Sequence, residues 1–243
     1  MAKTPTHPKD LFPEIIEDYR GLFGEDLLSI LLYGSATGKD YRPGKSDINF
    51  MIVLSETGIE ALHKALGTVE KWKKRRVATP LFLSKFYIET SVDVFPIEYL
   101  NFQGNHVVVY GEDVLKDLSF DPELLRLQCE REIKGKLLLL REAYLESAGK
   151  GKALKQVISQ SIGTFAAIFK ALLFLKARER PPETREIVKA TCDVFDLDSS
   201  VFERLLDIKL EREKPRDEEM QKIYADYLRE VRILSKRIDA IGG

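Results

Sequence analysis

The chain has 243 residues, with 38 basic and 39 acidic side chains and a formal net charge of −1. Hydrophobic residues make up 44% and charged residues 32%, which is the composition of a globular protein and excludes a disordered one. A chain of this length can bury a sizeable core as one large domain or two small ones. The near-zero charge gives no global reason to expect nucleic acid as a partner, so only a local basic patch would support one.

The two cysteines, Cys129 and Cys192, are too few for a disulfide framework. Both lie in helical patterns, so we interpret them as buried free thiols. The first residues lack the apolar core of a signal peptide. The most apolar segment, 157–175, is interrupted by Gln160 and Lys170, so a buried helix explains it better than a membrane span. We therefore expect a cytoplasmic protein with no membrane partner.

Short apolar runs alternate with helical patterns and glycine turns in the first part of the chain. The expected elements are a helix over 12–23 that Gly24 ends, a strand over 27–33, a loop over 34–46, a strand over 48–54, a helix over 56–76, a strand over 92–99 and a strand over 106–110. The runs at 27–33 and 48–54 are almost wholly apolar, which is typical of strands buried on both faces. Pro96 places the third strand at an edge, or ends it there.

From Asp121 onward every pattern is helical. Asp121-Pro122 combines a capping acid with a proline in the first turn, which predicts a helix start. Further helices are expected over 154–176, from Pro181-Pro182, from the capping box Ser200-x-x-Glu203, and through a last long stripe. The sequence therefore predicts an α+β chain, with an α/β domain over 1–120 and an all-α helical bundle over 121–243.

Candidate chemistry gathers around the first two strands. Gly34-Ser35 follows a buried strand directly, and such a turn offers close backbone approach and a hydroxyl to a phosphate. Asp47 and Asn49 are two residues apart on the next strand, so they project from the same face. Asp93, on the expected third strand, would complete the site. Basic residues of the intervening loop could meet phosphates: Lys39, Arg42 and Lys45.

These residues carry a family resemblance. Leu32-Tyr33-Gly34-Ser35, followed after a spacer by Ser46-Asp47-Ile48-Asn49 and a hydrophobic run, resembles the signature of the DNA polymerase β-like nucleotidyltransferase superfamily. Val92-Asp93-Val94 resembles its third, carboxylate-bearing element. The small bacterial and minimal nucleotidyltransferases are the most similar members in size. The resemblance covers residues 27–98 and implies a mixed sheet flanked by helices, ahead of the helical part.

The resemblance also implies roles for single residues. Gly34 and Ser35 would contact the triphosphate of a nucleotide, with Lys45 beside them. Asp47 and Asp93 would bind Mg²⁺, and Asp93 would also help to deprotonate the acceptor. Asn49 would be the third metal ligand, but its amide brings no negative charge where the family has a carboxylate. The implied activity is Mg²⁺-dependent transfer of a nucleoside monophosphate from a nucleoside triphosphate to a hydroxyl acceptor.

Several alternatives stay open at this point. Asn49 also fits a catalytically impaired module that binds a nucleotide or a partner protein, as an antitoxin would. The acceptor hydroxyl could belong to an aminoglycoside-like drug, a protein or a nucleic-acid end. The basic run from Lys71 to Arg76 is interpreted as a solvated helix end rather than as a nucleic-acid site. The apolar helical half leaves room for a homodimer.

Overall fold

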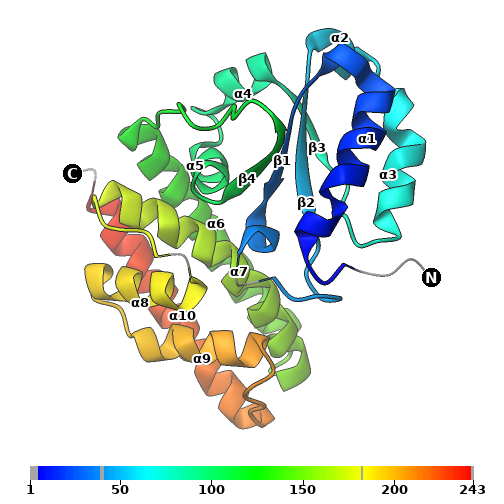
Figure 1. Ribbon diagram of the computed structural model, residues 1–243. Helices are drawn as coiled ribbons and strands as arrows, with labels where there is room; N and C mark the ends of the chain where they lie inside the picture. Colours follow the sequence, from blue (N-terminus) through cyan, green and yellow to red (C-terminus); the bar gives the residue numbers. More distant parts are fainter. Residues whose placement is uncertain (1–4, 39–40, 182, 242–243) are drawn as a thin grey trace. The chain divides into compact units, whose positions relative to one another are not determined.

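The computed structural model describes residues 5–38, 41–181 and 183–241. Contacts between Cα atoms divide the chain into two compact units. Residues Met1–Val94 and Tyr99–Ser119 form the sheet unit, and residues Phe95–Glu98 and Phe120–Gly243 form the helical unit. The predicted α+β class is confirmed (Figure 1). The division into domains at residue 120 stays a prediction.

The sheet unit contains a four-stranded sheet in the order β3-β2-β1-β4. Its helices and strands are α1 (Phe12–Phe23), β1 (Leu27–Tyr33), β2 (Asn49–Leu54), α2 (Glu56–Glu60), α3 (Leu66–Lys73), β3 (Leu81–Ser84), α4 (Lys85–Ser91), the later residues of α5 (Pro96–Gly104), and β4 (His106–Gly111). β1 pairs antiparallel with both β2 and β4, and β2 pairs parallel with β3. The expectation of a mixed sheet is therefore confirmed.

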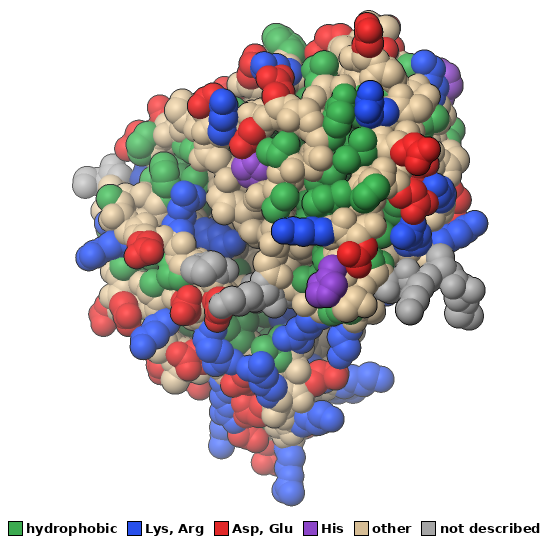
Figure 2. All heavy atoms as spheres, viewed as in Figure 1, with side chains coloured by type: hydrophobic (Ala, Val, Ile, Leu, Met, Phe, Trp, Pro, Cys, Tyr) green, Lys and Arg blue, Asp and Glu red, His purple; other side chains and the backbone are tan. Residues whose placement is uncertain are grey.

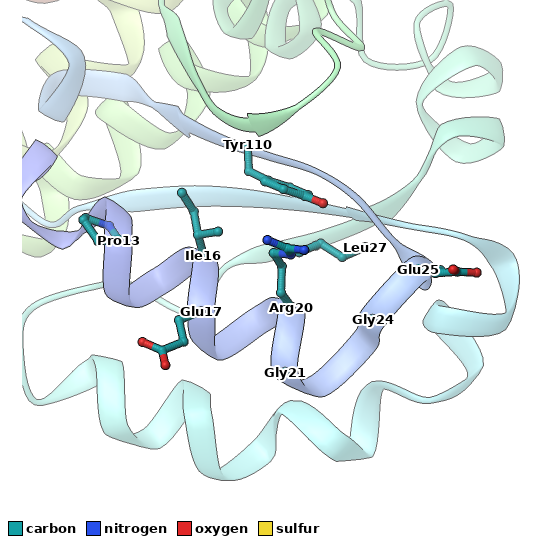
Figure 3. A pocket seen from close by; sticks show the side chains of 9 residues that line it. All are labelled: Pro13, Ile16, Glu17, Arg20, Gly21, Gly24, Glu25, Leu27 and Tyr110. Atoms are coloured by element: carbon teal, nitrogen blue, oxygen red, sulfur yellow. The ribbon is translucent and has the colours of Figure 1, made fainter.

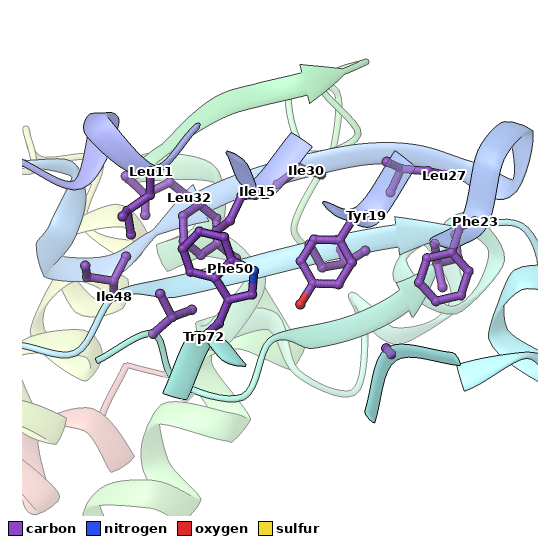
Figure 4. Close-up of a cluster of buried hydrophobic side chains, with 14 of the residues drawn as sticks. Leu11, Ile15, Tyr19, Phe23, Leu27, Ile30, Leu32, Ile48, Phe50 and Trp72 are labelled. Carbon is purple, nitrogen blue, oxygen red and sulfur yellow. The ribbon is translucent and has the colours of Figure 1, made fainter. Parts of the chain in front are cut away.

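The sheet buries both of its faces, as the apolar runs of β1 and β2 predict. On one face, α1 and α3 cover the strands around a shared hydrophobic core (Figure 4). Leu11, Ile15, Tyr19 and Phe23 recur every fourth residue, so they lie on one side of the helix and are all buried. Trp72 of α3 is fully buried in the same core. On the other face Tyr33 packs against Phe102 of α5, with ring centroids 4.8 Å apart.

Two regions of the sheet unit differ from the sequence prediction. The single helix expected over 56–76 is broken into α2, a 3₁₀ turn over Leu62–Ala65, and α3. The strand expected over 92–99 is wrong, because residues 92–94 form a turn and Pro96 begins α5. Proline suits the first helical turn, where its missing N–H would have no partner. The real third strand is the four-residue β3, which the sequence pattern did not reveal.

The helical unit contains α6 (Pro122–Glu146), α7 (Gly151–Leu175), α8 (Thr184–Phe195), α9 (Ser199–Lys209) and α10 (Asp217–Asp239). The predicted cap of α6 is confirmed, since the Asp121 carboxylate accepts hydrogen bonds from the backbone N–H groups of Glu123 and Leu124 at 2.8 and 3.1 Å. The capping box at Ser200 is wrong, because Asp198 caps α9 instead. The helix expected from Pro181-Pro182 begins at Thr184, and Pro182 lies outside the described residues.

α7 is the central helix of the helical unit and contacts α6, α8, α9 and α10. Its Phe165 packs edge-on against Tyr227 of α10, and its Phe169 packs against Phe202 of α9. By length and composition alone α7 is apolar enough to cross a membrane. Half of its most apolar stretch is buried within the protein, as in the core helix of a globular protein. The predicted cytoplasmic location stays a prediction.

Both cysteines are buried free thiols, as the sequence predicts. Burial raises the pKa of the Cys129 and Cys192 thiols to about 12. Because the thiolate is the reactive form, neither thiol should be alkylated by iodoacetamide in the native protein at about pH 8. Mass spectrometry should find the native protein unmodified and the protein unfolded in guanidinium doubly modified. Rapid alkylation of native Cys192 would contradict its buried position.

Candidate functional site

One end of the sheet brings together the first residues of β2 and β4 and the last residue of β1. Tyr33 is paired with Asn49 on one side and with His106 on the other. Gly34 follows Tyr33 directly, so the Gly34–Thr37 turn lies at this same end. The structure therefore places Gly34, with Ser35 next in the chain, beside Asn49, and their roles toward a nucleotide stay a prediction. We call this region the Gly34 end of the sheet.

The Gly34 turn needs glycine at its first position. Gly34 has a backbone φ of +78°, a conformation that other L-residues adopt at a cost of about 1 kcal/mol or more. A Cβ atom placed there would lie 3.4 Å from Nδ2 of Asn49, so the Asn49 amide nitrogen lies close to this turn. The turn closes as a 3₁₀ turn over Gly34–Thr37, in which the Thr37 hydroxyl donates to the Gly34 carbonyl at 2.8 Å.

Asn105 holds the Gly34 turn from the neighbouring strand. Its side-chain Nδ2 donates to the Gly34 carbonyl oxygen at 3.1 Å, and its Oδ1 is within hydrogen-bonding distance of the Thr37 hydroxyl. Asn105 immediately precedes β4, whose first residue pairs with Tyr33. The sequence gives no sign of this role, because the two partners are about seventy residues apart and become neighbours only through the register of the sheet.

Asp47 and Asn49 flank a buried residue at the start of β2. Ile48 and Phe50 are fully buried, whereas Asp47 is exposed and Asn49 is half-buried. Because side chains alternate along an extended chain, Asp47 and Asn49 lie on the opposite side from this core pair. Their predicted projection from one face is consistent with this alternation. The side chain of Asp47 remains 65% accessible, which leaves it open to a bound molecule.

Arg76 contacts Asp47 and was not expected in the site. Its Nη2 lies 3.3 Å from the Asp47 carboxylate and donates to the Lys45 carbonyl at 2.9 Å. Its own carbonyl accepts from the Ile48 N–H at 3.0 Å, and Val77 forms a parallel bridge with Ile48. Arg76 is thus fixed to both ends of the segment that carries Asp47. Burial raises the pKa of Tyr41, and the positive charge of Arg76 partly offsets this rise.

Two other basic residues of the 71–76 run, Lys71 and Arg75, have acidic partners. Lys71 pairs with Asp18 at 2.7 Å and with Glu14 at 2.9 Å, and Arg75 also pairs with Glu14. Hydrogen bonds from Lys71 and Arg75 lower the pKa of Glu14. Lys71 and Arg75 are therefore ion-paired as well as being in contact with solvent at the end of α3. Their pairing joins α3 to α1.

Asp93 does not lie on a strand. It is exposed in the turn between α4 and α5, so the argument that placed it beside β2 no longer holds. Its role as a metal ligand and catalytic residue stays a prediction. Among the described residues, no three His, Cys, Asp or Glu side chains come together as a metal site. Lys45 is exposed in the loop before Asp47, and Lys39 lies outside the described residues.

His106 is fixed at the Gly34 end. Its Nε2 lies 3.0 Å from the Asp113 carboxylate, and its Nδ1 lies 3.0 Å from the Phe102 carbonyl. Only 10% of the side chain is accessible. Both ring nitrogens therefore have protein partners, and His106 holds the start of β4 rather than facing solvent.

A groove elsewhere in the sheet unit contains none of the predicted site residues. It follows α1 to the start of β1, has a volume of about 780 Å³, and is lined by Pro13, Ile16, Glu17, Arg20, Gly21, Gly24, Glu25, Leu27 and Tyr110 (Figure 3). The Arg20 guanidinium lies over the Tyr110 ring, 5.5 Å from its centroid. Leu27 is at the opposite end of β1 from Gly34, so this groove is separate from the Gly34 end.

Charged side chains of both signs lie on the face drawn in Figure 2. Acidic and basic side chains are interspersed on this face, and hydrophobic side chains gather in one area of it. The mixture agrees with the formal net charge of −1. It gives no electrostatic support for a nucleic-acid partner on this face.

Comparison with known proteins identifies the fold but no close relative. No family model matches the sequence, and no curated protein sequence matches it. The chain is similar to the crystal structure of the spectinomycin adenyltransferase AAD(9) from Enterococcus faecialis with ATP and spectinomycin. The TM-score is 0.55 at 12% identity, and the match covers 95% of this chain and 98% of that one. The chain therefore has the nucleotidyltransferase fold, an α+β sheet unit followed by helices.

Proposed function

We propose that the chain binds a nucleoside triphosphate at the Gly34 end of the sheet and transfers its nucleoside monophosphate to a hydroxyl acceptor. The observation that carries this proposal is the Gly34 turn, which follows a buried strand and faces Asn49 at the point where β1, β2 and β4 meet. The similar fold of an adenyltransferase solved with ATP supports it. Fold alone does not choose the reaction, so the residues of the site must carry the argument.

The turn would hold the phosphates through its backbone. A glycine with a positive φ lets the chain approach a phosphate closely, and successive N–H groups of a tight turn form a cradle for an anion. The Ser35 hydroxyl adds a further donor. Lys45, exposed in the loop before Asp47, is free to reach a phosphate oxygen. Asn105 would keep the turn in this shape through its hydrogen bond to the Gly34 carbonyl.

The reaction balances as an in-line displacement. The acceptor hydroxyl oxygen attacks the α-phosphorus, and the bond to the oxygen that bridges the α- and β-phosphorus atoms breaks. Pyrophosphate leaves with that oxygen and its electron pair. The hydroxyl proton passes to water or to the exposed Asp47 carboxylate. Positioning and charge stabilisation supply most of the rate in such reactions.

The donor set fits one Mg²⁺ rather than two. Asp47 is a carboxylate, Asn49 offers only an amide oxygen, and Arg76 already contacts the Asp47 carboxylate. Magnesium is often held by one or two carboxylates together with substrate phosphates, so Asp47, Asn49 and the triphosphate would suffice for one ion. That ion would offset part of the phosphate charge. A second ion would need further carboxylates, and the described residues form no cluster of three.

A second candidate function is nucleotide binding without turnover. It is favoured by the amide at Asn49 and by the position of Asp93 in an exposed turn, which together leave Asp47 as the carboxylate of the site. In this case the chain would act through a partner protein that senses the bound nucleotide. The two candidates share the nucleotide site and differ only in whether pyrophosphate is released.

Substitution of Gly34 tests the nucleotide site. Gly34→Ala should weaken binding of ATP by about tenfold, because alanine resists the positive φ that shapes the turn. Gly38→Ala is the matched control, since Gly38 has a φ of −143° and open space around its Cβ position. Isothermal titration calorimetry measures both variants, and circular dichroism checks that both are folded. Equal affinity in wild type and Gly34→Ala would place the nucleotide elsewhere.

Substitution of Asn49 tests turnover. Wild type should transfer label from α-³²P-ATP to an acceptor panel, and Asn49→Asp should raise the rate by about tenfold or more because it adds a carboxylate. The panel contains spectinomycin, a protein mixture and RNA with free 3′ ends, with product separated by chromatography. Transfer by Asn49→Asp alone would favour the binding module. Absence of ATP binding in both proteins would reject the proposed function altogether.

A further inference from the structure

Arg76 occupies a position whose local backbone favours glycine. It follows the end of α3 with a φ of +64°, and the N–H of the next residue, Val77, bonds back to the Trp72 carbonyl at 3.2 Å. This is the hydrogen-bond pattern of a helix end that places its left-handed residue where glycine is the usual choice. Arginine at such a position costs backbone energy.

The ion pair of Arg76 with Asp47 contributes too little stability to offset the energy of the left-handed backbone. The two side chains are 41% and 65% accessible, and exposed ion pairs contribute little to folding. The backbone bond with Ile48 instead fixes the Arg76 main chain, and the hydrogen bond to the Lys45 carbonyl fixes the direction of the guanidinium. The charge is therefore held at the Gly34 end of the sheet, with a large part of its surface open.

The negative charge of a bound triphosphate would require a further cation at this site. A triphosphate brings several negative charges, and the proposed donor set of Asp47 and Asn49 would hold one magnesium ion. A guanidinium forms paired hydrogen bonds with phosphate oxygens and stays protonated throughout the usual pH range. It needs no carboxylate ligands, so it is compatible with an amide at position 49.

We propose that the Arg76 guanidinium contacts the bound triphosphate and takes the place of the second of two divalent cations, so that the site retains part of its nucleotide affinity when the remaining metal ion is removed. The proposal rests on the proposed nucleotide site at Gly34. The proposal also links the role of Arg76 to the residue at position 49. Because Asn49 leaves the site without the carboxylate that would hold a second metal ion, Arg76 supplies the positive charge of that ion.

Binding of α,β-methylene-ATP, which cannot release pyrophosphate, tests the proposal by calorimetry. The full chain is titrated in Mg²⁺ and in EDTA as wild type, Arg76→Gln, Arg76→Gly and the control Lys74→Gln, an exposed neighbour. Wild type should lose less than about tenfold in affinity when Mg²⁺ is removed. In EDTA, both Arg76 variants should bind the analogue about tenfold or more weakly than wild type does, and Lys74→Gln should bind it as wild type does.

Arg76→Gly separates loss of contact from loss of folding. Glycine suits the left-handed backbone at this position, so its thermal midpoint should equal that of wild type or exceed it. Wild type that binds in Mg²⁺ but not in EDTA would overturn the role of Arg76 and leave the nucleotide site intact. Arg76 variants that bind as tightly as wild type in EDTA would overturn it as well. No binding by wild type in either condition would reject the nucleotide site itself.

Discussion

The register of β1 with its two antiparallel neighbours is the constraint on which the candidate site depends. Pairing of Tyr33 with both Asn49 and His106 brings three chain segments to one end of the sheet. A shift by one residue would turn the alternating core side chains of the strand to the opposite face. Burial of both sheet faces prevents such a shift. The hydrophobic core therefore fixes the position of the Gly34 turn relative to Asn49 and Asn105.

The sequence pattern predicted the elements whose signal is local. The helix over 12–23, the first two strands and the cap at Asp121 depend on runs, periods and caps that a few residues carry. β3 was missed because four residues are too few for a periodic signal. Asp93 was misplaced because an apolar run around Pro96 fits either a strand or a helix start, and tertiary packing decides between them. Asn105 and Arg76 act through contacts between distant segments, which no local pattern records.

The chemistry of the site is unusual in its charge. Transferases that use two metal ions need several carboxylates, and the Gly34 end offers Asp47 with an amide and a guanidinium beside it. The overall fold resembles that of an adenyltransferase, whereas this donor set does not match a two-metal arrangement. The shared fold therefore does not establish the chemistry of the site. The fold positions the turn, and the proposed ligand chemistry rests on three side chains beside it, Asp47, Asn49 and Arg76.

The irregular edges of the sheet have a consequence for association. β4 loses its regular pairing with β1 between Ile30 and Leu31, and β3 on the other side is only four residues long. An edge that is short or bulged is a poor template for a strand from another molecule. Copies of this chain are therefore protected against edge-to-edge aggregation, and continuous β-sheet across two molecules is disfavoured as a route to a dimer.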